Sequence, residues 1–187
     1  MKLSVILLAA GLSERMGEDK LLLEFNKISM LERAINLINK IEAYEKFIVT
    51  TEPRIKKAAV PDDIKVIINP DPGKGLSSSI KLGVKNSKGT HYLFMAADQP
   101  KLRVNDIAPI INSVNKHSDK IIYPLVGGEP CMPAVFPSSF YDELISLKGD
   151  EGGKVLREKY PQLCVGITAE NPKNFADIDT KENYALF

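Results

Sequence analysis

The sequence predicts an α/β fold in three layers (α/β/α), with helices on both faces of a mainly parallel sheet. In the first half of the 187-residue chain, short apolar runs rich in β-branched residues alternate with helical patterns, which is typical of parallel strands joined by crossover helices. In the second half, two strand-like runs flank the residues GGEP, and this pattern predicts a hairpin that adds antiparallel strands. Because there is no internal repeat, low-complexity segment or linker, we expect residues 1–187 to form one domain.

The first half is expected to supply four strands and two helices. Residues 2–8, KLSVILL, form a short apolar run like that of a buried parallel strand. A helix is expected over residues 29–44, because apolar side chains recur at spacings of three and four, and because Ser29 and Glu32 form a capping box at its start. The other expected elements of this half are strands at 46–51, 63–69 and 91–98, with a short helix at 77–86.

The second half is expected to continue with a helix at 104–117, whose start Asn105 and Pro109 signal. The predicted hairpin joins residues 120–126 to residues 131–136. The remaining expected elements are helices near 137–147 and 152–159, a strand at 163–168 and a C-terminal helix at 180–186.

Composition excludes several classes of partner. The 25 basic and 24 acidic residues give a net charge of +1, so no overall field favours nucleic acid or an anionic membrane. No apolar run is long enough to span a bilayer, and the start, MKLSVILLAAG, is interpreted as a strand and not as a signal peptide. Cys131 and Cys164 lie far apart with no C-x-x-C pattern, as for reduced thiols. We therefore expect a cytoplasmic protein that binds neither nucleic acid nor membrane.

The loop after the first expected strand is a natural place for a ligand, because open α/β sheets bind ligands at the carboxyl ends of their strands. Residues 7–22 read LLAAGLSERMGEDKLL. A P-loop requires G-x-x-x-x-G-K-[ST], but Met16 stands five residues after Gly11 and Glu18 follows Gly17. A dinucleotide fingerprint requires G-x-G-x-x-G, which these two glycines do not form. The loop matches neither template.

The chemistry of this loop nevertheless suits a polyphosphate. The small residues Ala9, Ala10 and Gly11 let backbone N–H groups approach an anion closely. Arg15 can bind phosphate oxygens with its forked guanidinium, and Lys20 can add a second positive charge. Spacing alone leaves open a surface loop with two solvated cations.

Two acidic segments of the sequence suggest a metal site. Asp98 follows a strongly apolar strand, and a carboxylate at that edge of the sheet suits Mg²⁺ held by one or two carboxylates plus phosphates. The alternative is that Asp98 caps the turn before Pro100. In ADIDTKEN, one of Asp177 and Asp179, preferably Asp177, is the candidate second ligand. The alternative is that Asp179 or Thr180 simply caps the last helix.

The stretch GKGLSSSI, residues 73–80, offers glycines and hydroxyl groups just after the third expected strand. Gly75 permits close backbone approach, and Ser79 can hydrogen-bond a base or a ribose. Ser77 is explained equally well as the N-cap of the following helix.

The motifs together resemble those of the MobA/MocA-like nucleotidyltransferases, which act on the molybdenum cofactor. LAAGLSERMGEDKLLL, from Leu8, resembles the family's first signature, and GLSSSIKLGV (75–84) and MAADQP (95–100) are similar to the second and third. LKGDEGGKVL (147–156) and DIDTKENYALF (177–187) match the last two blocks, which point to the cytidylyltransferase-like branch. The resemblance covers essentially the whole chain and implies a nucleotide-diphospho-sugar-transferase-like fold, a GT-A-like Rossmannoid.

The resemblance also implies an activity: transfer of CMP from CTP to the terminal phosphate of molybdopterin cofactor, with release of pyrophosphate, to supply a molybdenum hydroxylase. A-A-G at residues 9–11 resembles the CTP-using form, whereas guanylyl enzymes tend to show G-G at its end. Arg15, Lys20 and Asp98 would be catalytic, and Asp98 with Asp177 would hold Mg²⁺. The residues at the nucleotide-binding positions are Leu8, Ala9, Ala10, Gly11, Arg15, Lys20, Gly75 and Ser79.

Departures from the family fall on the acceptor side. Asp150 and Gly152 match the family, but Gly153 and Lys154 stand where a small residue and an arginine are usual, and GGEPCMP (127–133) differs from the usual glycine-proline block. Two alternatives stay open. One is the same chemistry with GTP or another nucleotide and a different phosphorylated acceptor. The other is a non-catalytic protein that binds and delivers a nucleotide cofactor.

Overall fold

The computed structural model describes residues 1–12, 17, 19–25, 27–178 and 184. Within them, an eight-stranded sheet has the order β10-β7-β9-β6-β1-β4-β5, with β8 paired to β7, and a separate two-stranded sheet is formed by β2 and β3. The strands are β1 (Leu3–Ala9), β2 (Glu24–Phe25), β3 (Ile28–Ser29), β4 (Glu45–Thr50), β5 (Ile64–Ile68), β6 (His91–Ala96), β7 (Ile121–Val126), β8 (Glu129–Pro130), β9 (Ala134–Pro137) and β10 (Cys164–Thr168). The helices are α1 (Met30–Asn39), α2 (Glu52–Ile55), α3 (Leu76–Asn86), α4 (Val104–Ser113), α5 (Tyr141–Ser146) and α6 (Gly153–Lys159).

The pairing confirms a mainly parallel sheet with an antiparallel addition. Strand β1 pairs in parallel with both β4 and β6, and β10 pairs in parallel with β7. The antiparallel strand β9 is not at an edge, because it lies between β6 and β7. The predicted hairpin is thus correct in direction but incomplete in detail. Gly127 and Gly128, both at positive φ, turn the chain so that β8 pairs back onto β7 before β9 begins.

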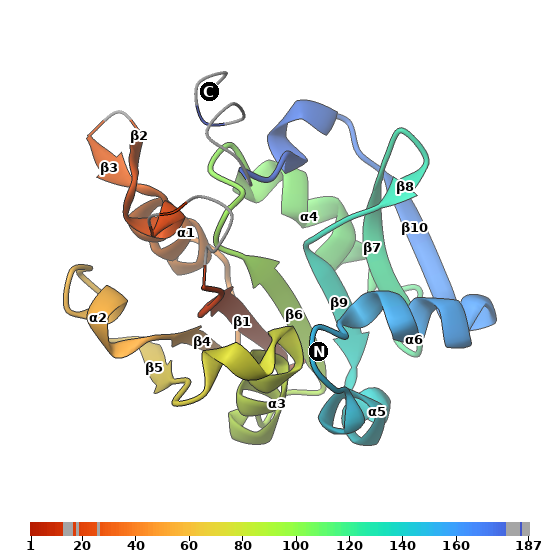
Figure 1. Ribbon diagram of the computed structural model, residues 1–187. Helices are drawn as coiled ribbons and strands as arrows, with labels where there is room; N and C mark the ends of the chain where they lie inside the picture. The colour runs from red at the N-terminus through yellow and green to blue at the C-terminus, as the bar shows by residue number, and fades with distance from the viewer. Residues whose placement is uncertain (13–16, 18, 26, 179–183, 185–187) are drawn as a thin grey trace.

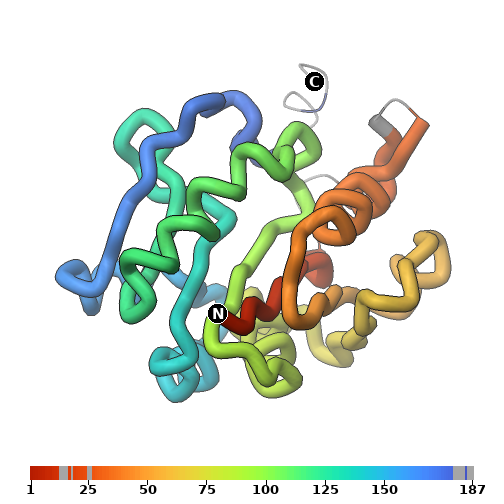
Figure 2. The backbone as a smooth tube through the Cα atoms, turned by 180° about the vertical axis from the view of Figure 1, so that it is seen from behind, coloured from red at the N-terminus to blue at the C-terminus, as the bar shows by residue number. Residues whose placement is uncertain are grey.

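Helices cover both faces of the sheet and form the three expected layers (Figures 1 and 2). Alternate residues of β1 face opposite sides, as the pleat of a strand requires. Val5 and Leu7 pack with residues of α1 and α4 in one buried cluster, and Ile6 packs with residues of α3, α5 and α6 in another. The near-continuous apolar sequence of β1 therefore reflects burial on both faces.

The helix boundaries differ in part from those expected. The capping box at the start of α1 is confirmed, with the Ser29 Oγ accepting from the Glu32 N–H at 3.2 Å. The helix ends at Asn39 and not at residue 44, because the chain must turn into the sheet: the Tyr44 N–H donates to the Leu3 carbonyl at 2.9 Å. Ser77 lies inside α3, and Gly75 is its N-cap.

Helix α4 begins at the predicted residue but ends earlier than predicted. It runs from Val104 to Ser113, whereas a helix was expected up to residue 117. The signals at Asn105 and Pro109 are wrong, because Pro109 lies inside the helix and the Asp106 carboxylate accepts from the Arg103 N–H at 2.9 Å at its start. The expected C-terminal helix at 180–186 falls outside the described residues except for Tyr184. In the described part of the chain, no helix has both the length and the apolar character of a membrane span.

Candidate nucleotide-binding site

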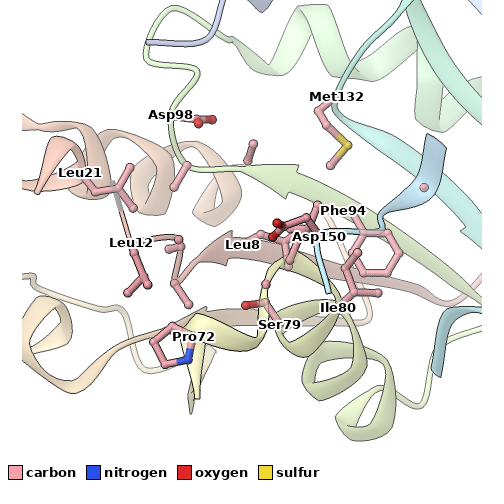
Figure 3. Close-up of a pocket in the computed structure, with 18 of the residues that line it drawn as sticks. Leu8, Leu12, Leu21, Pro72, Ser79, Ile80, Phe94, Asp98, Met132 and Asp150 are labelled. Carbon is pink, nitrogen blue, oxygen red and sulfur yellow. The ribbon is translucent and has the colours of Figure 1, made fainter. Parts of the chain in front are cut away.

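A cleft of about 700 Å³ lies at the carboxyl ends of β1 and β6 (Figure 3). Parallel strands bring the segments that follow them to the same edge of a sheet, which is where α/β folds bind ligands. Apart from Arg15, which lies outside the described residues, every residue predicted for nucleotide or metal binding lines this cleft. These residues are Leu8, Ala9, Ala10, Gly11, Lys20, Gly75, Ser79, Asp98 and Asp177.

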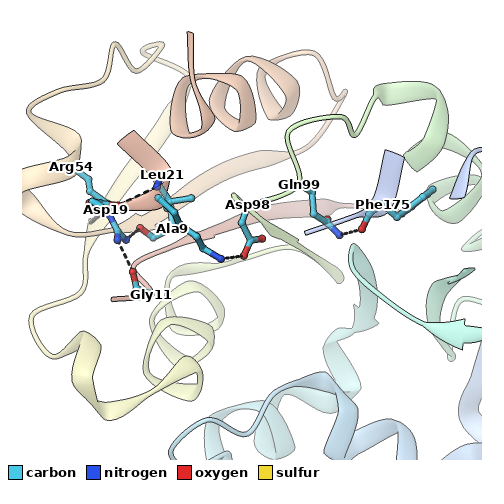
Figure 4. A network of polar contacts seen from close by, with 9 residues as sticks. Ala9, Gly11, Asp19, Leu21, Arg54, Asp98, Gln99 and Phe175 are labelled. Atoms are coloured by element: carbon cyan, nitrogen blue, oxygen red, sulfur yellow. Dashed lines mark hydrogen bonds and ion pairs between the residues drawn. The ribbon is translucent and has the colours of Figure 1, made fainter. Parts of the chain in front are cut away.

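An ion pair joins the first and third motifs across the cleft. Lys20 begins the short 3₁₀ helix η2 (Lys20–Leu22), and its Nζ lies 2.7 Å from Oδ2 of Asp98. Asp98 lies just beyond β6, because the strand ends at Ala96 and not at residue 98 as expected. The Asp98 carboxylate therefore stands in a turn, with its charge matched by the ammonium group (Figure 4).

The other oxygen of Asp98 has the character of a cation ligand. Oδ1 is buried, and no group in the described part of the chain hydrogen-bonds to it. A buried, unsatisfied carboxylate oxygen is costly unless a ligand or an ion completes it. The chemistry of this donor fits a hard cation such as Mg²⁺, which prefers carboxylate oxygens and shares its remaining positions with phosphates and water.

Asp177 is brought to the same place by the C-terminal segment. The Ile178 N–H donates to the Asp98 carbonyl at 3.0 Å. In addition, Gln99 Nε2 donates to the Phe175 carbonyl at 2.9 Å (Figure 4). Among the described residues, no group of three or more His, Cys, Asp or Glu side chains is arranged to hold a metal. Asp179, the other acidic residue weighed for this role, lies outside the described residues.

Cys131 lies near these acidic groups but is not suited to nucleophilic catalysis. Burial, and then the negative charge of Asp177, raise the pKa of the Cys131 thiol to about 11. A thiol with this pKa is protonated at neutral pH, and the thiolate is the reactive form. This excludes Cys131 as a ready nucleophile.

Gly75 and Ser79 shape the wall of the cleft opposite Asp98. Gly75 has a φ of 83°, and a Cβ at this position would lie 2.4 Å from the carbonyl carbon and oxygen of Gly149. The close approach that Gly75 permits is thus to another segment of the chain. Ser79 accepts a hydrogen bond from Asn69 Nδ2 at 3.0 Å, which holds its hydroxyl oxygen at the cleft wall. A side-chain contact from Asn69 was not predicted.

The inner end of the cleft is apolar. Phe94 and Phe136 meet edge to face with their ring centroids 5.7 Å apart. Met132, from the hairpin that departs from the family pattern, lines the same end (Figure 3). Gly153 is explained here, because a Cβ would lie 2.7 Å from Cζ of Phe136. Asp150 adds a carboxylate to this apolar end, so this end of the cleft suits a flat, partly polar ring.

Arg54 is the most important residue at the site that the sequence did not indicate. It lies in α2, is only 4% exposed, and forms an ion pair with Asp19 through Nε at 2.6 Å. Its Nη1 and Nη2 donate to the carbonyls of Ala9 and Gly11 at 2.7 and 2.6 Å (Figure 4). Its place just after a strand that pairs with β1 was the available signal, but its partners are mostly backbone carbonyls, which carry no sequence signature.

The chain is similar in sequence and in fold to known nucleotidyltransferases. Residues 5–163 match the family model of the MobA-like NTP transferase domain. The chain is 26% identical over 186 residues to the molybdenum cofactor cytidylyltransferase of Escherichia coli, covering 96% of this chain and 92% of that protein. It is 22% identical over 191 residues to a probable molybdenum cofactor guanylyltransferase of Bacillus mycoides, covering 98% and 94%. The solved structure of a nucleotidyl transferase from Methanothermobacter thermautotroptrophicus superposes with a TM-score of 0.80 at 21% identity, covering 99% of this chain and 95% of that one.

Proposed function

Since the chain belongs to the MobA-like NTP transferase family, we propose that it transfers CMP from CTP to the terminal phosphate of molybdopterin cofactor and releases pyrophosphate. The observation that carries this proposal is the Lys20–Asp98 pair, at 2.7 Å, in a cleft that combines a phosphate-binding loop with an apolar end. A molybdenum hydroxylase would receive the product.

The reaction needs positioning and charge neutralisation more than proton transfer. An oxygen of the acceptor phosphate attacks the α-phosphorus of CTP, and the bond from that phosphorus to the pyrophosphate oxygen breaks. The attacking phosphate is already ionised, so no general base is required. Lys20 lies where its ammonium can neutralise charge on the triphosphate and on the leaving pyrophosphate. Arg15, from the same loop, is proposed to assist it.

Mg²⁺ is the proposed cofactor, and the residues that would hold it are Asp98 and Asp177. The support for this is the buried, unsatisfied Oδ1 of Asp98 and the presence of both carboxylates in one cleft. When bound, the ion supplies positive charge that neutralises the phosphates. Asp98 would contribute Oδ1 of its carboxylate. The contacts of Lys20 with Oδ2 and of the Ile178 N–H with the Asp98 carbonyl hold the residue in the cleft.

The choice of CTP and of a pterin acceptor rests on different features. CTP is proposed from the A-A-G sequence at residues 9–11, and the relatives include both cytidylyl and guanylyl enzymes. The pterin acceptor is proposed from the apolar end of the cleft, where Phe94, Phe136 and Met132 can contact the flat faces of a ring. Asp150 can accept hydrogen bonds from ring N–H groups at that end.

The test is incubation of the protein with Mg²⁺, molybdopterin cofactor and, in separate reactions, CTP, GTP, ATP or UTP, followed by mass spectrometry. We expect a CMP adduct of the cofactor and one equivalent of pyrophosphate with CTP, and much less product with the other nucleotides. Product with GTP alone would establish the guanylyl activity instead. Tight binding of the finished dinucleotide with no turnover of any nucleotide would favour a delivery protein.

A further inference from the structure

The buried guanidinium of Arg54 lies next to the phosphate-binding loop without lining the cleft. Its position follows from topology. Strand β4 pairs in parallel with β1, with Thr50 opposite Ala9, so the residues just after Thr50 come close to the residues just after Ala9. Arg54 lies in the short helix α2 that follows, and its guanidinium faces that segment (Figure 4).

A charge buried to this degree requires partners, and among the described residues three oxygen acceptors from two segments contact Arg54. A buried ion without hydrogen bonds is strongly destabilising, and bonds from a guanidinium to oxygen acceptors are among the stronger ones in proteins. Two partners, the carbonyls of Ala9 and Gly11, lie at the start of the loop. The third, the carboxylate of Asp19, lies at its end. We call these three contacts the Arg54 clasp.

The clasp fixes which way the first peptide groups of the loop point. A trans peptide directs its C=O and its N–H to opposite sides, and the one cis bond among the described residues is Met132–Pro133. Because the carbonyls of Ala9 and Gly11 face Arg54, the N–H groups of Ala10 and Leu12 point away from it. Ala10 and Leu12 both line the cleft. Arg54 thus holds two backbone donors in a fixed orientation beside the ligand space.

The clasp acts on the other end of the loop as well. The Asp19 carboxylate accepts from Arg54 Nε through Oδ2, and from the Leu21 N–H at 3.2 Å through Oδ1. Asp19 is the N-cap of η2, whose first residue, Lys20, reaches Asp98. Holding Asp19 in place therefore also fixes the backbone position from which the Lys20 side chain extends.

We propose that Arg54 is a positioning residue for the nucleotide, which sets the backbone donors and Lys20 in the geometry that binds a triphosphate. This rests on the proposed function in that the ligand is taken to be a nucleoside triphosphate. Arg54 does not contact the ligand, so its effect is on nucleotide affinity and not on acceptor affinity.

The experiment is calorimetric titration of CTP and of GTP, each with Mg²⁺, into the full chain and into Arg54→Met and Arg54→Lys. For the nucleotide that the wild type binds, we expect Arg54→Met to raise Kd by roughly 10- to 100-fold, because loop donors move away from their positions. The Kd of Arg54→Lys is expected to lie between those of the wild type and Arg54→Met. A lysine keeps the charge but lacks the forked guanidinium that contacts these three acceptors. The KM for the acceptor is expected to stay unchanged in both variants.

Lys46→Met is the matched control. Lys46 lies on the same strand, β4, at the end remote from the cleft, and is likewise buried, with its Nζ donating to the Asn39 carbonyl at 2.8 Å and to Asp63 at 2.9 Å. The Lys46→Met variant removes a comparable buried cation. A loss of nucleotide affinity that came only from general destabilisation would therefore appear in this variant too. The double variant Arg54→Met/Asp19→Asn is expected to lose less nucleotide binding free energy than the sum of the losses in the two single variants, because both substitutions remove the same contact.

The outcomes separate this assignment from the proposed function. If Arg54→Met does not fold, Arg54→Lys decides. Wild-type affinity in the folded Arg54 variants, or an equal loss of affinity in Lys46→Met, would overturn the positioning role while leaving nucleotide binding intact. No binding of any nucleoside triphosphate by the wild type would overturn the proposed function and this role with it.

Discussion

Lys20 and Asp98 form an ion pair in the cleft. In the proposed function each group has a second partner, which is phosphate for Lys20 and a metal ion for Asp98. The Lys20 ammonium lies 2.7 Å from Oδ2 of Asp98, and both side chains are largely buried. An ion pair removed from water is stronger than one at the surface. The ammonium therefore provides the positive charge that the carboxylate requires. It also competes with any cation for that carboxylate.

Lys20→Met is therefore expected to bind Mn²⁺ more tightly than the wild type in the absence of nucleotide, because the competing ammonium is gone. The same variant is expected to lose turnover by roughly 100-fold, because a group that stabilises phosphate charge is missing. Mn²⁺ affinity can be measured by electron paramagnetic resonance, and turnover by pyrophosphate release. Asp98→Asn is the control that should weaken Mn²⁺ binding. Unchanged Mn²⁺ affinity in Lys20→Met would contradict competition for Asp98.

At the scale of elements, the apolar strands of the main sheet were predictable from the sequence, whereas the two-residue strands β2, β3 and β8 and the short helix α2 were not. Strands β1, β4 and β6 follow from apolar runs whose boundaries are correct to within two residues. Helix α2 is too short for a periodic pattern, since it spans 4 residues. The place of β9 between β6 and β7 depends on contacts between distant segments, which no local pattern specifies. Arg54 was missed for the same reason, because its contacts with Ala9, Gly11 and Asp19 depend on where α2 is placed.

The 3₁₀ helix η3 (Pro72–Lys74) and the start of α3 are joined by Gly75, whose conformation and packing leave no room for a side chain. Gly75→Ala would place a methyl group 2.4 Å from the Gly149 carbonyl, at a φ of 83°. Both the backbone strain and the clash with a main chain oppose the substitution, so we expect a loss of about 2 kcal/mol or more in the free energy of unfolding. Urea denaturation measures this.

Gly73→Ala is the matched control for that prediction. Gly73 lies in the same 3₁₀ helix, and a Cβ there would have no heavy atom within 4 Å. The change is expected to alter the free energy of unfolding by no more than about 0.5 kcal/mol. Equal losses in the two variants would show that contact with Gly149 is not what Gly75 provides.

At the scale of the whole molecule, the cleft is built from both halves of the chain. Gly11 and Lys20 come from the N-terminal loop, whereas Asp150 and Asp177 come from the last third of the sequence. The hydrogen bond from the Ile178 N–H to the Asp98 carbonyl joins these parts. Gly11 and Lys20 were indicated because they follow a strand and start a short helix, whereas Asp150 and Asp177 were indicated by motifs that resemble those of the family. Their convergence depends on the order of strands in the sheet, which only the structure supplies.

Ligand binding should consequently stabilise the molecule as a whole. A ligand at 100 times its Kd adds about 2.7 kcal/mol to the free energy of unfolding, which corresponds to a rise in Tm of roughly 5–10 °C for a chain of this size. We expect this rise with CTP and Mg²⁺, measured by calorimetry, together with slower hydrogen exchange at Ala10, Leu12 and Ile178. Cytidine is the control, since it carries the base without the phosphates and should give little rise at the same concentration. An equal rise with cytidine would mean that the base, and not contacts of the phosphates with the loop, with Lys20 and with the metal, supplies the binding energy.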